Sequence, residues 1–186
     1  MRKNFGSKPW CYPMPVFIVA TYDENGNPNA MNAAWGGIDY DDRINICMGD
    51  DHKTTQNLKV SKAFTVSMGT VDQMVVCDYV GVESALKASD KWKKTGWHAE
   101  KSEFVNAPII RELPMTMECE MVSYDEEECH LVGRIVNISV DESVLDEEGK
   151  IDVRKLRPIS YDPVKHEYLE ISGKVGNAFK DGLALK

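Results

Sequence analysis

One stretch of the chain combines residue types that could hold a flat polar ligand against a β-strand. Residues 28–37 read Pro-Asn-Ala-Met-Asn-Ala-Ala-Trp-Gly-Gly. In a strand, side chains alternate between two faces, here Ala30, Asn32 and Ala34 on one and Met31, Ala33 and Trp35 on the other. The short side chains would leave the backbone open to a planar ring, whose polar edge could pair with backbone N–H groups and the Asn32 amide. The alternative is a half-buried structural strand with Trp35 in the core.

A possible anion site follows at residues 50–55, which read Asp-Asp-His-Lys-Thr-Thr and lead into a predicted helix. A helix N-terminus offers unpaired N–H groups and a partial positive charge, which together attract phosphate. The Thr54 and Thr55 hydroxyls could donate hydrogen bonds, and His52 and Lys53 could add positive charge. The alternative is that Thr54 or Thr55 simply caps the helix while Lys53 lies in solvent.

The charge pattern gives a further reason to expect a small anion. The chain of 186 residues carries a formal charge of −8, which disfavours nucleic acid and anionic membranes as partners. Residues 85–101 nevertheless hold five lysines against two acids, a local excess of three positive charges. This basic segment could serve a small anion, although a solvated surface helix explains the charges equally well.

The composition predicts a globular protein of the cytoplasm. Hydrophobic residues make up 42% and charged residues 28% of the chain, and no apolar run approaches the ~18 residues of a membrane span. The N-terminal residues lack the apolar core of a signal peptide. Five cysteines and four histidines are scattered without metal-ligand spacing, so we expect neither a disulfide framework nor a metal site. Cys77 and Cys119 are expected to be buried and unreactive.

The hydrophobic pattern predicts a chain made mainly of strands. β-branched and aromatic residues indicate strands over residues 15–22, 28–37, 43–48, 63–68, 115–123 and 130–140, with one more short strand within 159–171. Helices are expected over residues 54–61 and 71–82, and the lysine-rich residues 83–105 are expected to form an excursion of helix and loop.

Turn signals between these segments indicate how they connect. Asn25-Gly26 predicts a hairpin turn because both residues tolerate positive φ, and the acidic runs 125–128 and 145–150 are typical of solvated turns. Seven or so strands joined mostly by hairpins, with few helices, predict an antiparallel barrel and not a βαβ fold. We expect a single domain over residues 1–186.

An ordered set of short motifs spans nearly the whole chain. The motifs are Pro15-Val16, Asn25-Gly26, residues 28–37, His52-Lys53-Thr54, Gly81-x-x-Ser84, Asp90-Lys91-Trp92, Asn106-Ala107-Pro108, Leu113-Pro114, Glu118-Cys119, His130-x-x-x-Gly133-Arg134-Ile135-Val136, and Leu156-Arg157-Pro158-Ile159 through Tyr168. Through this set the chain resembles the flavin reductase-like domain family, most closely its flavoredoxin branch.

This resemblance implies an antiparallel split β-barrel of Greek-key type that binds flavin mononucleotide (FMN) and forms a homodimer, with FMN close to the subunit interface. Carried onto this sequence, the strand Met31, Asn32, Ala33, Ala34 and Trp35 would contact the ring system. His52, Lys53, Thr54 and Thr55 would surround the phosphate, and Ser84 and Lys91 would complete the site. Tyr161 and Tyr168 could line the same pocket, although core packing explains them equally well.

In such a protein the flavin carries the chemistry, so the sequence predicts no catalytic side chain. The first hypothesis is an oxidoreductase in which NADH or NADPH reduces FMN; a nicotinamide stacked on the ring would need no G-x-G-x-x-G fingerprint, and none is present. The second is an electron carrier of the flavoredoxin type with a redox protein as partner. The third is a non-catalytic FMN-binding module.

Overall fold

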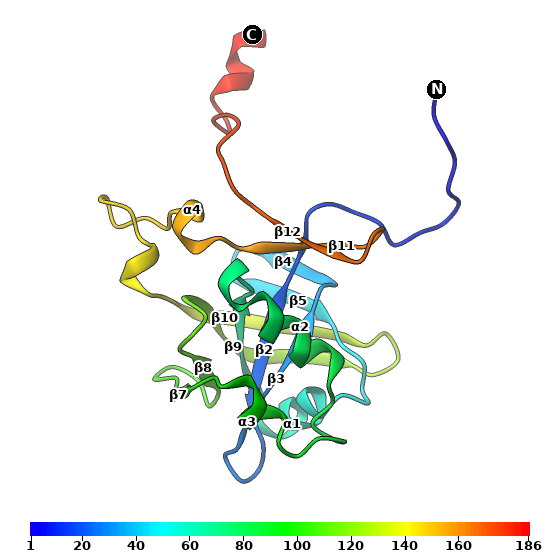
Figure 1. The fold of residues 1–186 in the computed structure, drawn as a ribbon, viewed down its shortest axis with the longest axis vertical. Helices are drawn as coiled ribbons and strands as arrows, with labels where there is room; N and C mark the ends of the chain where they lie inside the picture. Colours follow the sequence, from blue (N-terminus) through cyan, green and yellow to red (C-terminus); the bar gives the residue numbers. More distant parts are fainter.

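The computed structural model describes all residues 1–186, and a seven-stranded antiparallel sheet forms its centre (Figure 1). The strands, in spatial order, are β3 (Pro28–Ala33), β2 (Phe17–Tyr22), β6 (Ala63–Met68), β9 (Met115–Asp125), β10 (His130–Val140), β5 (Arg43–Cys47) and β4 (Gly36–Tyr40). The sheet curls into a half-barrel, which confirms the predicted antiparallel split-barrel class.

Two small sheets and short helices complete the fold. The small sheets pair β1 (Met14–Pro15) with β11 (Ile159–Asp162) and β12 (Glu167–Glu170), and β7 (Ala99–Lys101) with β8 (Pro108–Ile110). The helices are α1 (Lys53–Ser61), α2 (Met74–Val82), α3 (Lys91–Thr95) and α4 (Val153–Leu156), with 3₁₀ turns at Val71–Gln73, Glu142–Val144 and Asp181–Leu185. In Figure 1, α2 lies across the sheet in front of β2 and β3.

The predicted hairpin turns form for the expected reasons. Between β2 and β3, Gly26 takes a φ of +78°, and the Asp23 carboxylate accepts hydrogen bonds of 2.8 Å from the N–H groups of Asn25 and Asn27. Between β9 and β10, the Asp125 carboxylate accepts hydrogen bonds in the same way from the N–H groups of Glu127 and Glu128. Side-chain carboxylates therefore satisfy the backbone of both turns.

The two larger hydrophobic clusters of the core lie one on each face of β3. Met31 and Ala33 pack into the larger cluster around Phe64, whereas Ala30 packs into the cluster beneath α2 with Cys77. The alternation predicted for this strand is therefore confirmed from Ala30 to Ala33.

The predicted strand 28–37 is wrong beyond Ala33, where β3 ends. The chain then crosses to the other edge of the sheet: the N–H of Cys47 donates a 2.8 Å hydrogen bond to the Trp35 carbonyl, and Gly36 pairs with Ile46 in β5. A Cβ atom on Gly36 would lie 2.6 Å from the Asn45 carbonyl oxygen, so the crossing requires glycine. Trp35 lies at the corner with 53% of its surface exposed, and is not a core residue.

Two other expectations need smaller corrections. The helix predicted over 71–82 begins as a 3₁₀ turn and becomes α-helical only from Met74. The single strand expected within 159–171 is a pair, because residues 163–166 turn and return the chain as β12.

Both terminal segments extend away from the body of the molecule (Figure 1). The longest α-helices have nine residues, and none of the helices has the length and apolar character needed to cross a membrane.

Candidate functional site

Two adjoining hollows form one elongated cleft between β3, the start of α1 and the end of α2. The first has a volume of about 400 Å³ and the second about 260 Å³, and both include Asn32, Gly81 and Val82 in their walls. The first hollow is also lined by Asn29, Met31, Asp51, His52, Lys53, Thr54, Val80, Lys91 and residues 83–87. The second is also lined by Ala34, Trp35, Asp78, Tyr161 and Tyr168.

The start of α1 faces the first hollow without a cap. His52 is the N-cap residue, and its side chain makes no capping hydrogen bond. The backbone N–H groups of Lys53, Thr54 and Thr55 have no acceptor within the chain. The predicted cap at Thr54 or Thr55 is wrong, because both hydroxyls are engaged elsewhere. Thr55 Oγ1 donates a 2.8 Å hydrogen bond to the carbonyl oxygen of Gly49.

Thr54 is a buried hydroxyl with one free donor. Its Oγ1 accepts a 2.7 Å hydrogen bond from the Asn29 amide, and both residues are buried. A hydroxyl that accepts a hydrogen bond still has its own proton to donate. Since Thr54 lines the first hollow, this end of the cleft presents a hydroxyl donor beside three free backbone N–H groups.

Lys91 carries a buried positive charge at the same end. Only 4% of its surface is exposed, and its Nζ donates hydrogen bonds of 2.7 Å to the Ala30 carbonyl and 2.8 Å to the Val80 carbonyl. Burial lowers the pKa of Lys91 to about 8, and the nearby Glu83 charge opposes that shift. An ammonium group has three N–H donors, so one remains beyond the two carbonyls.

The two acids at this end are turned to other partners. Asp51 is fully open to solvent and lies 3.4 Å from His52 Nδ1, and Glu83 accepts a 3.0 Å hydrogen bond from the N–H of Ser84. The N–H of Leu86 in turn donates to Ser84 Oγ. The donor set at this end of the cleft therefore fits an anion such as phosphate.

The other end of the cleft has a largely apolar wall that also holds the Asn32 amide and the Asp78 carboxylate. Asn32 Nδ2 donates to the Cys77 carbonyl at 3.0 Å and to the Tyr168 hydroxyl at 3.4 Å. A Cβ atom on Gly81 would lie 2.9 Å from Asn32 Cβ, so glycine lets α2 approach β3 this closely. With Trp35 and Tyr161 also in the wall, this end fits a planar ring.

The structure brings most of the sequence-predicted site residues to this cleft and keeps two away. Those in the walls are Met31, Asn32, Ala34, Trp35, His52, Lys53, Thr54, Ser84 and Lys91. Ala33 points into the core on the opposite face of β3, and Thr55 is fully buried against Gly49. Sequence reasoning missed Asn29 and Asp78; the position of Asn29 inside the stretch 28–37 was a usable signal, whereas nothing local marks Asp78.

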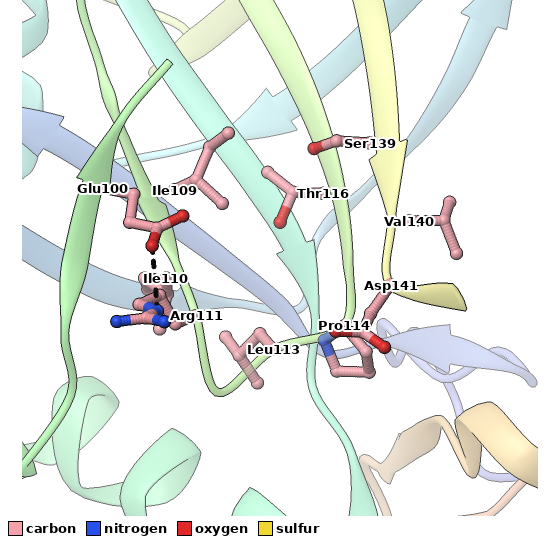
Figure 2. A pocket seen from close by; sticks show the side chains of 10 residues that line it. All are labelled: Glu100, Ile109, Ile110, Arg111, Leu113, Pro114, Thr116, Ser139, Val140 and Asp141. Atoms are coloured by element: carbon pink, nitrogen blue, oxygen red, sulfur yellow. Dashed lines mark ion pairs between the residues drawn. The ribbon is translucent and has the colours of Figure 1, made fainter. Parts of the chain in front are cut away.

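Another pocket of about 320 Å³ lies beside the start of β9 and the end of β10 (Figure 2). Figure 2 shows Glu100 and Arg111 facing one another, and these two side chains form an ion pair of 2.9 Å. None of the predicted site residues lies in this pocket. The cleft beside β3 is therefore the stronger candidate site.

The cysteines are not part of a reactive centre in the cleft. Cys77 and Cys119 are fully buried, which confirms the expectation from the sequence. Burial raises the pKa of the Cys77 thiol to about 11 and that of the Cys119 thiol to about 12, so neither forms a thiolate near neutral pH.

The curled antiparallel sheet with a cleft at the start of α1 defines a split-barrel protein of the flavin reductase-like class. The chain belongs to that family: the model of the flavin reductase like domain matches residues 10–162.

Solved structures agree with this assignment. The chain is 32% identical to the flavoredoxin of Desulfovibrio vulgaris (Miyazaki F), with a TM-score of 0.93 over 98% of this chain and 100% of that one. It shares its fold with a flavoredoxin from Methanosarcina acetivorans (22% identity, TM-score 0.88, all of both chains). The chain also shares its fold with an FMN-binding domain of a flavin reductase-like enzyme from Shewanella baltica OS155 (17% identity, TM-score 0.78, 88% of both chains).

Proposed function

We propose that this protein binds FMN in the cleft beside β3 and acts as an oxidoreductase that takes electrons from NADH or NADPH. The observation that carries the proposal is the pairing of two unlike ends in one cleft. One end offers three free N–H groups and the Thr54 hydroxyl, and the other offers the largely apolar wall around Asn32 and Trp35. A phosphate joined to a planar ring matches both ends.

In this proposal the start of α1 and Thr54 bind the phosphate, while Lys53 and the free N–H of Lys91 offset its charge. Ser84 lies beside the same hollow, and the Asn32 amide orients the ring. A bound flavin supplies the hydride acceptor, so the chain itself has to bind, orient and shield the ring. This division of work agrees with the absence of a predicted catalytic side chain.

The exposure of the ring end supports a small-molecule donor. Trp35 is half-exposed and Val82 is more exposed still, so the second hollow is open to solvent beside the ring wall. A nicotinamide could reach a ring held there by stacking against its open face. The family membership supports the same reaction class.

A second candidate is an electron carrier that exchanges electrons with a protein partner. The similarity to a flavoredoxin over 98% of the chain favours it. The two candidates share the cofactor and differ in whether a nicotinamide reduces the protein quickly.

We also propose that the protein is a homodimer. Ile38 and Tyr40 on the edge strand β4 are 63% and 69% exposed, and the half-exposed Trp35 directly precedes this strand. An exposed edge strand with large apolar side chains is typical of a surface that pairs with another chain. Light scattering behind size-exclusion chromatography tests this, and a monomer at micromolar concentration would contradict it.

The deciding experiment is an absorbance spectrum of the purified protein, reconstituted with FMN if needed, followed by anaerobic addition of NADH and then NADPH. Flavin bands that bleach within seconds of adding a nicotinamide support the reductase. Bands that bleach only with dithionite or a reduced redox protein support the electron carrier. Bound FMN that no physiological donor reduces indicates a non-catalytic module, and failure to take up FMN refutes the cofactor.

A further inference from the structure

A chain of hydrogen bonds joins α2, β12 and β3 at the ring end of the cleft. The Tyr168 hydroxyl donates to Asp78 Oδ1 at 2.8 Å. The same hydroxyl accepts from Asn32 Nδ2 at 3.4 Å, and Asn32 Nδ2 also donates to the Cys77 carbonyl at 3.0 Å. The chain therefore runs from a carboxylate at one end to a backbone carbonyl at the other.

The chemistry of the two ends fixes the direction of every bond between them. An ionised carboxylate and a backbone carbonyl can only accept hydrogen bonds. Tyr168 must therefore donate its proton to Asp78, which leaves its oxygen to accept from Asn32. Burial and the hydrogen bond to Asp78 raise the pKa of Tyr168, so its hydroxyl keeps the proton that the chain requires.

In this arrangement both N–H groups of the Asn32 amide donate hydrogen bonds, and the amide oxygen accepts none. Asn32 Oδ1 has no hydrogen-bond partner within the chain. The Tyr79 hydroxyl is the one buried side-chain polar atom without a partner, so Asn32 Oδ1 is accessible and not buried. Asn32 lines both hollows of the cleft. The amide therefore presents an acceptor, and no donor, to whatever ring lies there.

The neighbouring backbone limits how far the amide can turn. A Cβ atom on Gly81 would lie 2.9 Å from Asn32 Cβ, so α2 packs directly against the base of this side chain. The amide can change its orientation only by rotating about its own terminal bond, which would aim the oxygen at the Cys77 carbonyl. Two acceptors facing one another are unfavourable.

We propose that Tyr168 and Asp78 are positioning residues that hold the Asn32 amide with its oxygen toward the cleft, so that the cleft selects a ring carrying an N–H group at that point. This inference rests on the proposed function and refines it. The imide N–H of FMN is a donor of this kind, and N3-methyl FMN lacks it while keeping the phosphate and the ring system.

The test compares the dissociation constants of FMN and N3-methyl FMN, measured by quenching of flavin fluorescence. Wild type is expected to prefer FMN by about tenfold, the value of one hydrogen bond in a desolvated site. Tyr168→Phe frees one N–H of Asn32 and leaves the Cys77 carbonyl as the only group that orients the amide, so the preference for FMN should weaken. Asp78→Asn keeps a partner for Tyr168 but allows the bond to run in either direction, so it should give an intermediate preference.

Tyr161→Phe is the matched control. It removes the same atom from a neighbouring tyrosine of the second hollow whose hydroxyl pairs with His166 and not with Asn32. This variant should keep the wild-type preference for FMN over the methylated analogue. Loss of the preference in both tyrosine variants would show a general packing effect and overturn the proposal.

Failure of the inference can be separated from failure of the proposed function. If wild type binds neither flavin, the proposed function is refuted. If wild type binds both flavins equally, or Tyr168→Phe keeps the full preference, FMN binding stands and the positioning role is overturned. The flavin-free protein gives an independent reading by ¹⁵N NMR: the two side-chain N–H signals of Asn32 should be distinct and protected in wild type, and one should lose protection in Tyr168→Phe. Unchanged protection would also overturn the proposal.

Discussion

The Nζ atom of Lys91 lies 2.7 Å from the carbonyl oxygen of Ala30, and this hydrogen bond ties the start of α3 to the middle of β3. The same ammonium donates to the Val80 carbonyl in the last turn of α2, where the helix dipole favours a positive charge. One buried cation therefore fixes three walls of the cleft relative to one another. The site depends on packing between elements as much as on its ligand-facing groups.

The Thr54 hydroxyl is expected to contribute both to stability and to phosphate binding. Thr54→Val leaves the buried Asn29 amide without its acceptor, which should cost about 1–2 kcal/mol of unfolding free energy. It also removes a donor from the anion end of the cleft, so FMN should bind about tenfold more weakly. Urea unfolding and flavin fluorescence measure the two effects.

Riboflavin and Thr54→Ser provide the controls for that prediction. Riboflavin lacks the phosphate, so its affinity should change little in Thr54→Val, whereas serine keeps the hydroxyl and should preserve most of the FMN affinity. An equal loss for riboflavin and FMN would contradict a role of Thr54 at the phosphate.

Replacing Gly133 in β10 by a larger residue is expected to destabilise the sheet. A Cβ atom there would lie 2.3 Å from Phe64 Cζ, and Phe64 is fully buried in the larger core cluster, so its ring has no free space to enter. Gly133→Ala should lower the unfolding free energy by about 2–3 kcal/mol, as overpacking does in a close-packed core. The control is Gly37→Ala in β4, where a Cβ meets nothing and stability should change by less than about 0.5 kcal/mol. Equal urea midpoints for the two variants would argue against this account.

Four of the five cysteines should fall into two classes of reactivity. Cys11 and Cys47 are exposed and should react quickly with iodoacetamide, whereas Cys77 and Cys119 should react slowly, since burial raises both of their pKa values and blocks access. Mass spectrometry of peptides after brief labelling separates the classes, and labelling in denaturant provides the reference in which all five react. Early modification of Cys77 at the rate of Cys11 would count against a buried, inert role.

Local patterns were sufficient to predict most of the strands and the general position of the cleft. The hairpin at Asn25-Gly26 depends on residues within one turn, and the alternation in β3 depends only on the pleat of a strand. The prediction of an anion site at the start of α1 is local in the same way, because free N–H groups are a property of any helix N-terminus.

The errors come from contacts that are distant in sequence. Thr54 is not a cap because Asn29, 25 residues away, engages its hydroxyl. Residues 34–35 leave the strand because Gly36 pairs with β5 across the sheet. Tyr168 and Asp78 lie 90 residues apart, and only the packing of β12 beside α2 brings them together. Such pairings are set by tertiary structure, which overrides local preference.

The buried charge of Lys91 leads to a pH dependence of FMN binding. Its pKa in the flavin-free protein is about 8, so below that pH the ammonium is already charged and its titration does not affect affinity. Above pH 8 the free protein loses this proton, and since a nearby phosphate favours the charged form, binding must take the proton up again. FMN affinity should therefore fall by up to about tenfold per pH unit above 8, as measured by fluorescence quenching between neutral pH and mild alkali. Lys91→Arg keeps a permanent charge and should flatten the fall, and riboflavin should show no such dependence in wild type. A decline of the same steepness in Lys91→Arg would assign the proton to another group.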